Sequence, residues 1–300
     1  MTERASAAIG PGTAVHGMPE PAGSTRIGPQ VFDWGSRTYV MGILNVTPDS
    51  FSGDGLLAAG NDPVDAAVVQ GRRMVDEGAD LLDVGGESTR PGHDEVAAAD
   101  ELARVVPVVA ALRAALPDTP ISIDTTKPSV AAAALDAGAD LLNDVWGVAP
   151  GNDMLRLAAE RGAPIVLMHN RAEARYTNLM AEILADLHAA IDRALAAGVA
   201  WEAIVVDPGF GFGKTAEHNL ALLRDLGLLR ALGRPILLGT SRKSTLGKVL
   251  DLDADERLEA TLATTALGIA AGVDVVRVHD VRPNVRAARM TDAIVRGSPG

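Results

Sequence analysis

The chain of 300 residues contains no cysteine. This absence excludes disulfide bonds, thiolate nucleophiles and Cys-ligated zinc or iron–sulfur centres. Aromatic residues are only 3% of the total, so Ala, Val, Leu and Ile must supply most of the core. A chain without disulfides is compatible with a reducing compartment, and we expect a cytoplasmic protein.

No apolar run reaches the roughly 18 residues that indicate a membrane-spanning helix. The N-terminus also lacks the basic-then-apolar pattern of a signal peptide. The formal net charge of −12 argues against general nucleic-acid binding and against an anionic membrane as a partner. We therefore expect small-molecule substrates, and an anionic substrate would need cations gathered at one place.

Several common catalytic motifs are missing as well. The sequence has no HExxH, G-x-S-x-G or GxGxxG, so zincin, α/β-hydrolase and Rossmann interpretations lack support. The segment VDPGFGFGKT resembles a phosphate loop, but from Gly209 to Gly213-Lys214 it is one residue short of that motif. We interpret it as a Gly-rich strand-to-helix turn whose backbone can approach a ligand closely.

Apolar runs alternate with helical segments along most of the chain. The runs are nearly continuous, as in parallel strands buried on both faces. The segments between them place apolar residues near the 3.6-residue period, as in 63–78, 94–116, 127–138, 178–198 and 255–272. We predict strands at 39–44, 79–84, 120–123, 139–143, 163–168, 203–206, 234–239 and 274–278. Eight such units favour a closed (β/α)8 TIM barrel in a single domain, because the alternative, a doubly wound open sheet, would leave edges to protect.

The N-terminal region differs in composition. Residues 1–28 are rich in Gly, Ala, Pro and Ser without periodicity, and we expect a disordered extension. Residues 29–300 then form the barrel domain. The segment 31–40 is interpreted as a short hairpin with Trp34-Gly35-Ser36 near its turn, which would plug the lower end of the barrel.

Short polar signatures follow the predicted strands at their C-terminal ends. In a (β/α)8 barrel these ends form one face, which carries the active site. The signatures are Asn45, Glu87-Ser88-Thr89-Arg90, Asp124, Asn143-Asp144, Met168-His169-Asn170, Asp207, Ser241-Arg242-Lys243, Arg277 and His279.

Each signature also has a structural alternative. Arg277 and His279 alternate along a strand and make an anion site if they face the barrel mouth. Otherwise His279 is buried and Arg277 pairs with Asp280. His169 fits the core or a pocket wall equally well, and Asp207 suits a helix cap or an ion pair.

Taken together, eight segments in order resemble the dihydropteroate synthases of the pterin-binding barrel family. The segments are MGILNVTPDSFS (41–52), GGESTRPG (85–92), SIDTTKPSVA (122–131), LLNDVWG (141–147), VLMHN (166–170), VDPGFGFGKT (206–215), TSRKSTLG (240–247) and RVHDV (277–281). They span roughly residues 30–296. The family joins p-aminobenzoate to 6-hydroxymethyl-7,8-dihydropterin diphosphate, and it releases pyrophosphate and 7,8-dihydropteroate in folate biosynthesis.

The resemblance implies a role for individual residues. It implies a pterin pocket from Asp124, Asn143, Asp207 and Lys243, with Met168 and Phe212 as walls and Arg277 stacked on the ring. An anion site would use Asn45, Arg277 and His279, with Mg²⁺ bridging the diphosphate to Asn45, since Mg²⁺ prefers oxygen ligands. Thr89, Arg90 and Ser244 would lie at the p-aminobenzoate subsite. Arg277, His279, Lys243 and Asp54 are the catalytic candidates. The resemblance also implies a homodimer and a target of sulfonamides, which mimic p-aminobenzoate.

One loop departs from the family pattern. The sequence reads Ser52-Gly53-Asp54-Gly55, where the family usually has Asp before two glycines, so the carboxylate of Asp54 is shifted by one position. We expect activity to survive this shift. Two alternatives stay open: a pterin-dependent methyltransferase of the related barrel branch, which needs no diphosphate site, and a degenerate paralogue that binds pterin without turnover.

Overall fold

In the described part of the chain, eight parallel strands form a closed barrel. The computed structural model describes residues 23–46, 62–87, 96–151 and 153–297. The sheet order is β8-β7-β6-β5-β4-β3-β10-β9. A parallel bridge between Val206 and Ile236 joins the two outer strands, and the backbone N–H of Val206 donates to the Pro235 carbonyl at 2.9 Å. The (β/α)8 prediction is therefore confirmed, and the open-sheet alternative is wrong. The strands are β3 Tyr39–Asn45, β4 Leu81–Gly85, β5 Ile121–Asp124, β6 Leu141–Asp144, β7 Ile165–Met168, β8 Ile204–Asp207, β9 Leu237–Leu238 and β10 Val275–Val278.

Seven of the eight strands begin and end within two residues of their predicted limits. The exception is β9, which has two residues instead of the predicted six at 234–239. Pro235 has no N–H to give to a strand ladder. The N–H of Ile236 donates to the Asp274 carboxylate at 3.0 Å, so a side chain replaces a backbone partner there.

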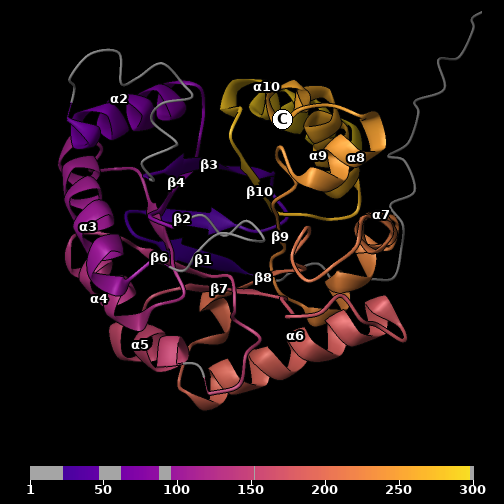
Figure 1. Ribbon diagram of the computed structural model, residues 1–300, viewed down its shortest axis with the longest axis horizontal. Coiled ribbons are helices and arrows are strands. Elements are labelled where there is room, and N and C mark those ends of the chain that lie inside the picture. Colours follow the sequence, from indigo (N-terminus) through magenta and orange to yellow (C-terminus); the bar gives the residue numbers. More distant parts are fainter. Residues whose placement is uncertain (1–22, 47–61, 88–95, 152, 298–300) are drawn as a thin grey trace, which may run out of the picture.

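Helices surround the strands in an outer ring (Figure 1). Asp62 caps α2 by accepting from the Val64 N–H at 2.9 Å, and a proline occupies the first turn. After α2 and α6 the chain turns through Gly78 (φ +103°) and Gly198 (φ +97°), in the left-handed conformation that is common where helices end. The helices are α2 Pro63–Asp76, α3 Ala98–Ala115, α4 Pro128–Asp136, α5 Asp153–Arg161, α6 Leu179–Ala196, α7 Ala216–Arg224, α8 Ser244–Leu250, α9 Leu258–Ala270 and α10 Val281–Val295, with 3₁₀ turns at Trp201–Ala203, Leu226–Leu232 and Ala254–Glu256.

A hairpin plugs the N-terminal end of the barrel. It consists of β1 Ser24–Ile27 and β2 Gln30–Asp33, paired antiparallel. The prediction of a hairpin at this end is confirmed, but its predicted limits, 31–40, are wrong because the turn lies at 28–29 and Tyr39 already belongs to β3. The boundary of the predicted disordered extension is also wrong, since its residues 24–27 form a strand; residues 1–22 lie outside the described residues.

Two cores lie on the two sides of the barrel wall. The larger core, between strands and helices, is built from Ala, Val, Leu, Ile and a few other residues, as the composition predicts. The smaller core lies inside the barrel, where Phe32, Trp34 and Tyr39 pack with ring centroids 4.6–5.6 Å apart. The scarce aromatics thus concentrate in the plug and close one end, which leaves the C-terminal ends of the strands for a site. In the described part of the chain, no helix has the length and apolarity that crossing a membrane requires.

Candidate active site

Strand register brings the predicted polar residues together at the C-terminal end of the barrel. Asn45 on β3 pairs with Gly85 on β4, and Gly85 pairs with Asp124 on β5. Asp124 in turn pairs with Asn143 on β6. Parallel strands end at one edge, so four neighbouring strands present their end residues in a row. These are an amide, a glycine without a side chain, a carboxylate and a second amide. The gap at Gly85 leaves room beside the side chains of Asn45 and Asp124.

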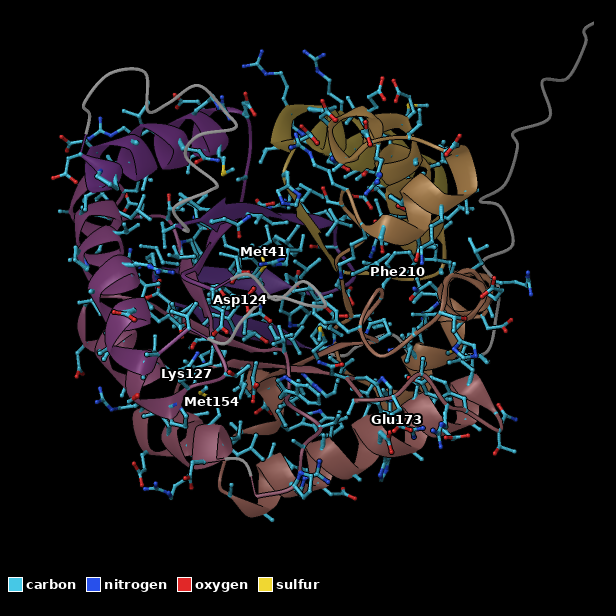
Figure 2. All side chains as sticks on the ribbon, in the orientation of Figure 1. Met41, Asp124, Lys127, Met154, Glu173 and Phe210 are labelled. Atoms are coloured by element: carbon cyan, nitrogen blue, oxygen red, sulfur yellow. The ribbon has the colours of Figure 1, made fainter. Side chains whose placement is uncertain are left out.

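A pocket opens at this end of the barrel, with about 280 Å³ of empty space that includes open solvent. Nine of the described residues line it: Asp124, Asn143, Val145, Met168, Asp207, Phe212, Gly239, Lys243 and Arg277. All of these except Val145 and Gly239 are predicted site residues. Figure 2 shows Asp124 near the centre of the barrel, inside the ring of helices. The structure therefore gathers seven predicted residues, drawn from six strands and the loops that follow them, around one cavity.

Arg277 is held between two carboxylates on the far side of the barrel. Its Nε lies 2.6 Å from Asp83 Oδ2, and its Nη2 lies 2.7 Å from Asp124 Oδ2. Asp83 also accepts from Asn143 Nδ2 at 3.0 Å. The alternative that Arg277 pairs with Asp280 is wrong, because Asp280 forms a two-bond ion pair with Arg242 instead.

Asp83 is a site residue that sequence reasoning missed. Its side chain is fully buried beneath the pocket, where it orients both Arg277 and Asn143. A signal was present in the sequence, because Asp83 interrupts the apolar run LLDVG of β4. A carboxylate inside a strand that is buried on both faces requires a charged or hydrogen-bonding partner.

One oxygen of the Asp124 carboxyl group is available to accept a hydrogen bond from a ligand. Burial raises its pKa to about 7; Arg277 acts against this shift, and the neighbouring Asp83 adds to it. Its Oδ1 is buried and has no hydrogen-bond partner within the described residues. Buried polar atoms are rarely left unpaired. An unpaired oxygen on a pocket-lining carboxyl group indicates a ligand that donates a hydrogen bond to it.

Lys243 supplies the cation on the opposite wall. Its ammonium donates to the Phe210 carbonyl and lies 4.4 Å from the centre of the Phe212 ring. Burial lowers the pKa of Lys243 to about 8, while Asp207 acts in the opposite direction. Burial likewise raises the pKa of Asp207, although Lys243 and the Gly209 N–H, at 2.6 Å, both favour its charged form.

The residue before Lys243 has an unusual backbone conformation. Arg242 has φ +57°, in the left-handed region that side chains other than Gly, Asn and Asp seldom adopt. Its carbonyl accepts from Arg257 at 2.9 Å, and its guanidinium is held by Asp280. These contacts hold a turn that directs Lys243 into the pocket, and strain of this kind is often found at functional sites.

Three other predicted residues, His279, Asn45 and Ser244, lie outside the pocket lining. His279 Nδ1 is 3.0 Å from Ser241 Oγ, which also accepts from the His279 N–H. Asn45 is half-buried at the end of β3, and Ser244 is exposed in the first turn of α8. The predicted residues Asp54, Thr89 and Arg90 lie outside the described residues.

The structure distinguishes the two interpretations of His169. Its side chain is fully buried behind the pocket wall, with Nε2 3.1 Å from Asp186 and Nδ1 2.9 Å from Lys214 Nζ. It is therefore a core histidine. The same contact argues against the phosphate-loop alternative, because the amine of Lys214 points inward and donates to backbone carbonyls rather than to an open loop.

Within the described residues, no group of three or more His, Asp or Glu side chains is arranged to hold a metal ion. The oxygen donor next to the pocket is the amide of Asn45, beside Gly85. A single amide oxygen suits a hard cation that takes its other ligands from substrate and water.

Comparisons with known proteins agree on one family. Residues 41–279 match the family model described as "Pterin binding enzyme". The chain is 52% identical over 272 residues to the dihydropteroate synthase of Clostridium beijerinckii, covering 90% of this chain and 99% of that protein.

Solved structures give the same result. A dihydropteroate synthase from Clostridium difficile, crystallised with pteroic acid, superposes with a TM-score of 0.84 at 52% identity, covering 88% of this chain and 99% of that one. The Xanthomonas albilineans enzyme in complex with 7,8-dihydropteroate gives 0.83 at 37% identity, covering 92% and 100%.

Proposed function

The chain belongs to the family of pterin binding enzymes, and we propose that it condenses 6-hydroxymethyl-7,8-dihydropterin diphosphate with p-aminobenzoate. It is a transferase of folate biosynthesis, which forms a C–N bond and releases pyrophosphate. The observation that carries the proposal is the pocket at the strand ends, with carboxyl groups and an ammonium placed around one small cavity.

The pocket chemistry matches the edge of a pterin. The ring offers amino and N–H donors, and the unpaired Oδ1 of Asp124 is a ready acceptor. Asn143 uses its amide nitrogen on Asp83, so its oxygen stays available as a second acceptor. Lys243 can donate to the ring carbonyl, and Met168 and Phe212 supply apolar walls. A flat heterocycle bound this way is oriented before reaction.

We assign Arg277 and His279 to the departing diphosphate. Arg277 reaches the pocket from β10 with its charge partly balanced by Asp83 and Asp124. His279 lies two residues farther along the chain, fixed by Ser241. Positive charge held at the place where negative charge develops favours departure, and the electron-rich pterin stabilises the methylene cation that the arylamine attacks. The amine proton is released as the new C–N bond forms, so no strong base is required.

Magnesium fits this arrangement as an ion carried with the diphosphate. Asn45 would hold it by its amide oxygen, at the end of β3 and beside the pocket. When bound, the ion neutralises charge on the leaving diphosphate. The residues of the chain bind the pterin, orient it and supply the remaining positive charge.

The p-aminobenzoate subsite is assigned to the side of the pocket near Phe212 and Ser244. Phe212 lines the cavity, and Ser244 directly follows Lys243 at the start of α8. Thr89 and Arg90 belong to the same proposed subsite, and Asp54 stays a catalytic candidate; all three lie outside the described residues. Sulfonamides, which share the arylamine shape, are proposed to compete at this subsite, and a related enzyme from Yersinia pestis has been crystallised with a sulfonamide drug.

We also propose that the enzyme is a cytoplasmic homodimer. Exposed apolar side chains gather on the C-terminal helices, which lie side by side (Figure 1). Leu267 on α9 is 62% exposed, and Met290 and Ile294 on α10 are 64% and 70% exposed. Apolar patches of this kind commonly mark an interface. We propose that a second copy of the chain packs against these side chains of α9 and α10.

The activity is tested by pyrophosphate release from purified protein with Mg²⁺, pterin diphosphate and p-aminobenzoate, with the product identified by mass. Release that requires both substrates is the expected result. Binding of pterin diphosphate without release would instead identify a degenerate paralogue. Turnover with a methylated pterin and a corrinoid protein would identify a methyltransferase.

A further inference from the structure

A lysine outside the pocket fixes the loop that forms one of its walls. The β8–α7 loop, residues 208–215, connects Asp207 to α7 and carries two pocket features: the Phe212 side chain and the Phe210 carbonyl that accepts from Lys243. Lys214, near the end of this loop, points away from the cavity. We propose that Lys214 is a positioning residue for the pterin pocket, acting by tying the β8–α7 loop to His169 at the end of β7. This inference rests on the proposed function.

Every donor of the Lys214 ammonium has a partner. It lies 2.9 Å from His169 Nδ1, 3.0 Å from the Gly209 carbonyl and 3.0 Å from the Phe212 carbonyl. An ammonium has three donors and no acceptor, so three partners satisfy it. Two of them are carbonyls of the loop itself and the third is a side chain of the neighbouring strand end. Lys214 thus fixes the backbone of Phe212 directly.

The imidazole of His169 is prepared for this contact. Its Nε2 faces the Asp186 carboxylate at 3.1 Å, so that nitrogen carries the proton and Nδ1 presents a lone pair to Lys214. Burial lowers the pKa of His169 to about 4, and the nearby Lys214 adds to this shift, which keeps the ring neutral. His169 directly follows Met168, so its contact with Lys214 lies next to a residue of the pocket wall.

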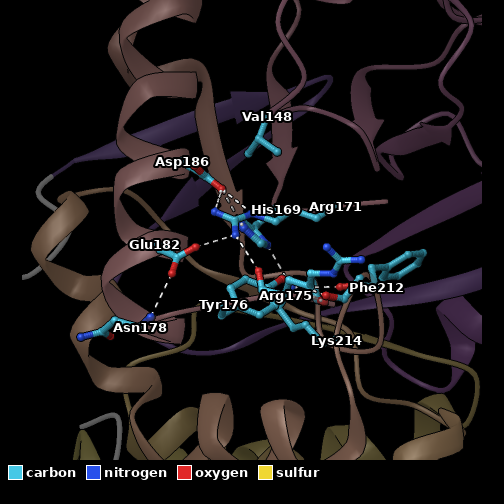
Figure 3. A network of polar contacts seen from close by, with 12 residues as sticks. Val148, His169, Arg171, Arg175, Tyr176, Asn178, Glu182, Asp186, Phe212 and Lys214 are labelled. Carbon is cyan, nitrogen blue, oxygen red and sulfur yellow. Dashed lines mark hydrogen bonds and ion pairs between the residues drawn. The ribbon is translucent and has the colours of Figure 1, made fainter. Parts of the chain in front are cut away.

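A chain of ion pairs holds the His169 side chain in turn (Figure 3). Arg171 donates to Asp186 through Nε and Nη2, at 3.0 and 2.8 Å, and to Glu182 through Nη1 at 2.6 Å. Glu182 accepts from the N–H groups of Thr177 and Asn178 at the start of α6. The orientation of His169 is therefore fixed from the helix side, by a network that does not itself line the pocket.

The backbone of the β8–α7 loop also lies unusually close to the segment that follows β7, at His169 and Arg171. A Cβ at Gly209 would meet the His169 carbonyl oxygen at 1.8 Å, and one at Gly213 would meet the Arg171 carbonyl oxygen at 2.3 Å. Both glycines have positive φ, +69° and +54°. Tyr176 Oη adds a hydrogen bond to the Gly213 carbonyl at 2.9 Å. Without Lys214, the carbonyls of Gly209 and Phe212 and the Nδ1 of His169 would each lose a hydrogen-bond donor.

The test compares three variants with the wild type: Lys214→Met, which keeps the length of the side chain but removes its donors, Tyr176→Phe, and the control Lys248→Met on the exposed side of α8. The dissociation constant of pterin diphosphate is measured by calorimetry, kcat and KM for both substrates by pyrophosphate release, and Tm by calorimetry. Lys214→Met should raise the pterin dissociation constant about 10- to 100-fold, because three hydrogen bonds of the Lys214 amine are lost together. Its kcat at saturating substrate should change much less. Tyr176→Phe should raise the constant about two- to tenfold, because one neutral hydrogen bond is lost, and Lys248→Met should leave it unchanged.

A purely structural role for Lys214 would lower Tm while the folded variant kept its pterin affinity, and that result overturns the proposal. A loss confined to kcat overturns it as well. If Lys214→Met does not fold, Tyr176→Phe decides, since normal affinity in that variant shows that anchoring this loop does not govern the pocket. Failure of the wild type to bind pterin diphosphate overturns both this inference and the proposed function, whereas equal binding by wild type and variants overturns the inference alone.

Discussion

Lys243→Met separates the contribution of the pocket cation to binding from its contribution to folding. Methionine keeps most of the unbranched stem, which packs beside Gly211 and under the Phe212 ring, and removes the charge. The lost groups are the donor to the Phe210 carbonyl and the donor assigned to the pterin. Because the side chain of Lys243 is half-buried in the pocket wall, water cannot fully replace that charge.

The expected magnitude follows from the contacts. A hydrogen bond to a charged group contributes roughly 1.5–3 kcal/mol, which corresponds to about 10- to 150-fold in pterin affinity. The free energy of unfolding should change in the opposite direction, because the substitution that weakens pterin binding also removes a charge that burial disfavours. The pKa of Lys243 is lowered from 10.5 to about 8, so the protonated form destabilises the folded state below pH 8, and this cost disappears as pH rises toward 10.5. At pH 7 the variant should therefore unfold at the same temperature as the wild type or higher, with part of the gain offset because Asp207 loses a neighbouring cation.

Calorimetric titration with pterin diphosphate and a thermal scan at pH 7 check both statements, with Lys248→Met as the matched surface control. Weak binding together with an unchanged or higher Tm supports the reasoning. Affinity within about twofold of the wild type would refute the assignment of Lys243 to the pterin. A fall in both affinity and Tm would show that the ammonium stabilises the β8–α7 loop rather than binding the pterin.

Three further outcomes are expected. His279→Ala should lower kcat by about 100-fold but leave pterin affinity nearly unchanged, because its partner is the leaving group; equal losses in kinetics and calorimetry would contradict that role. Asp124→Asn should flatten the pH dependence of the unfolding free energy between about pH 4 and 7, since a carboxyl group with a raised pKa contributes stability that is full below pH 4 and lost as pH rises through 7. Urea titrations at several pH values measure this slope, and an unaltered slope would count against it. Ile294→Arg on α10 should convert the proposed dimer to a monomer in light scattering, whereas the control Val69→Arg on α2, where the side chain is 56% exposed, should not; a dimer in both variants places the interface elsewhere.

The sequence was sufficient for the architecture because hydrophobic burial has a simple period. Continuous apolar runs such as IVLM and IVVD can satisfy both faces only in a parallel sheet covered by helices. The N-terminal hairpin was harder to place. Its strands are short and half exposed, so their pattern is weak, and the aromatic residues of 32–39 belong to the plug and to β3 at once.

Site residues at strand ends were predictable for the same geometric reason. Asp124, Asn143 and Asp207 each close an apolar run, and parallel strands bring such positions to one face. Asp83 and Lys214 were not found, since their roles depend on partners far away in the chain. Asp83 lies 194 residues from Arg277, and Lys214 lies 45 residues from His169.

The sequence by itself determined the barrel, the end of it that carries chemistry, and the residue types available there, because these follow from local periodicity and strand polarity. Only the tertiary structure decided which charges meet. It placed Arg277 between Asp83 and Asp124 rather than beside Asp280, and it turned His169 and Lys214 away from the cavity to hold its wall. Such pairings are set by the distances that barrel closure imposes across the structure, and no spacing along the chain encodes them.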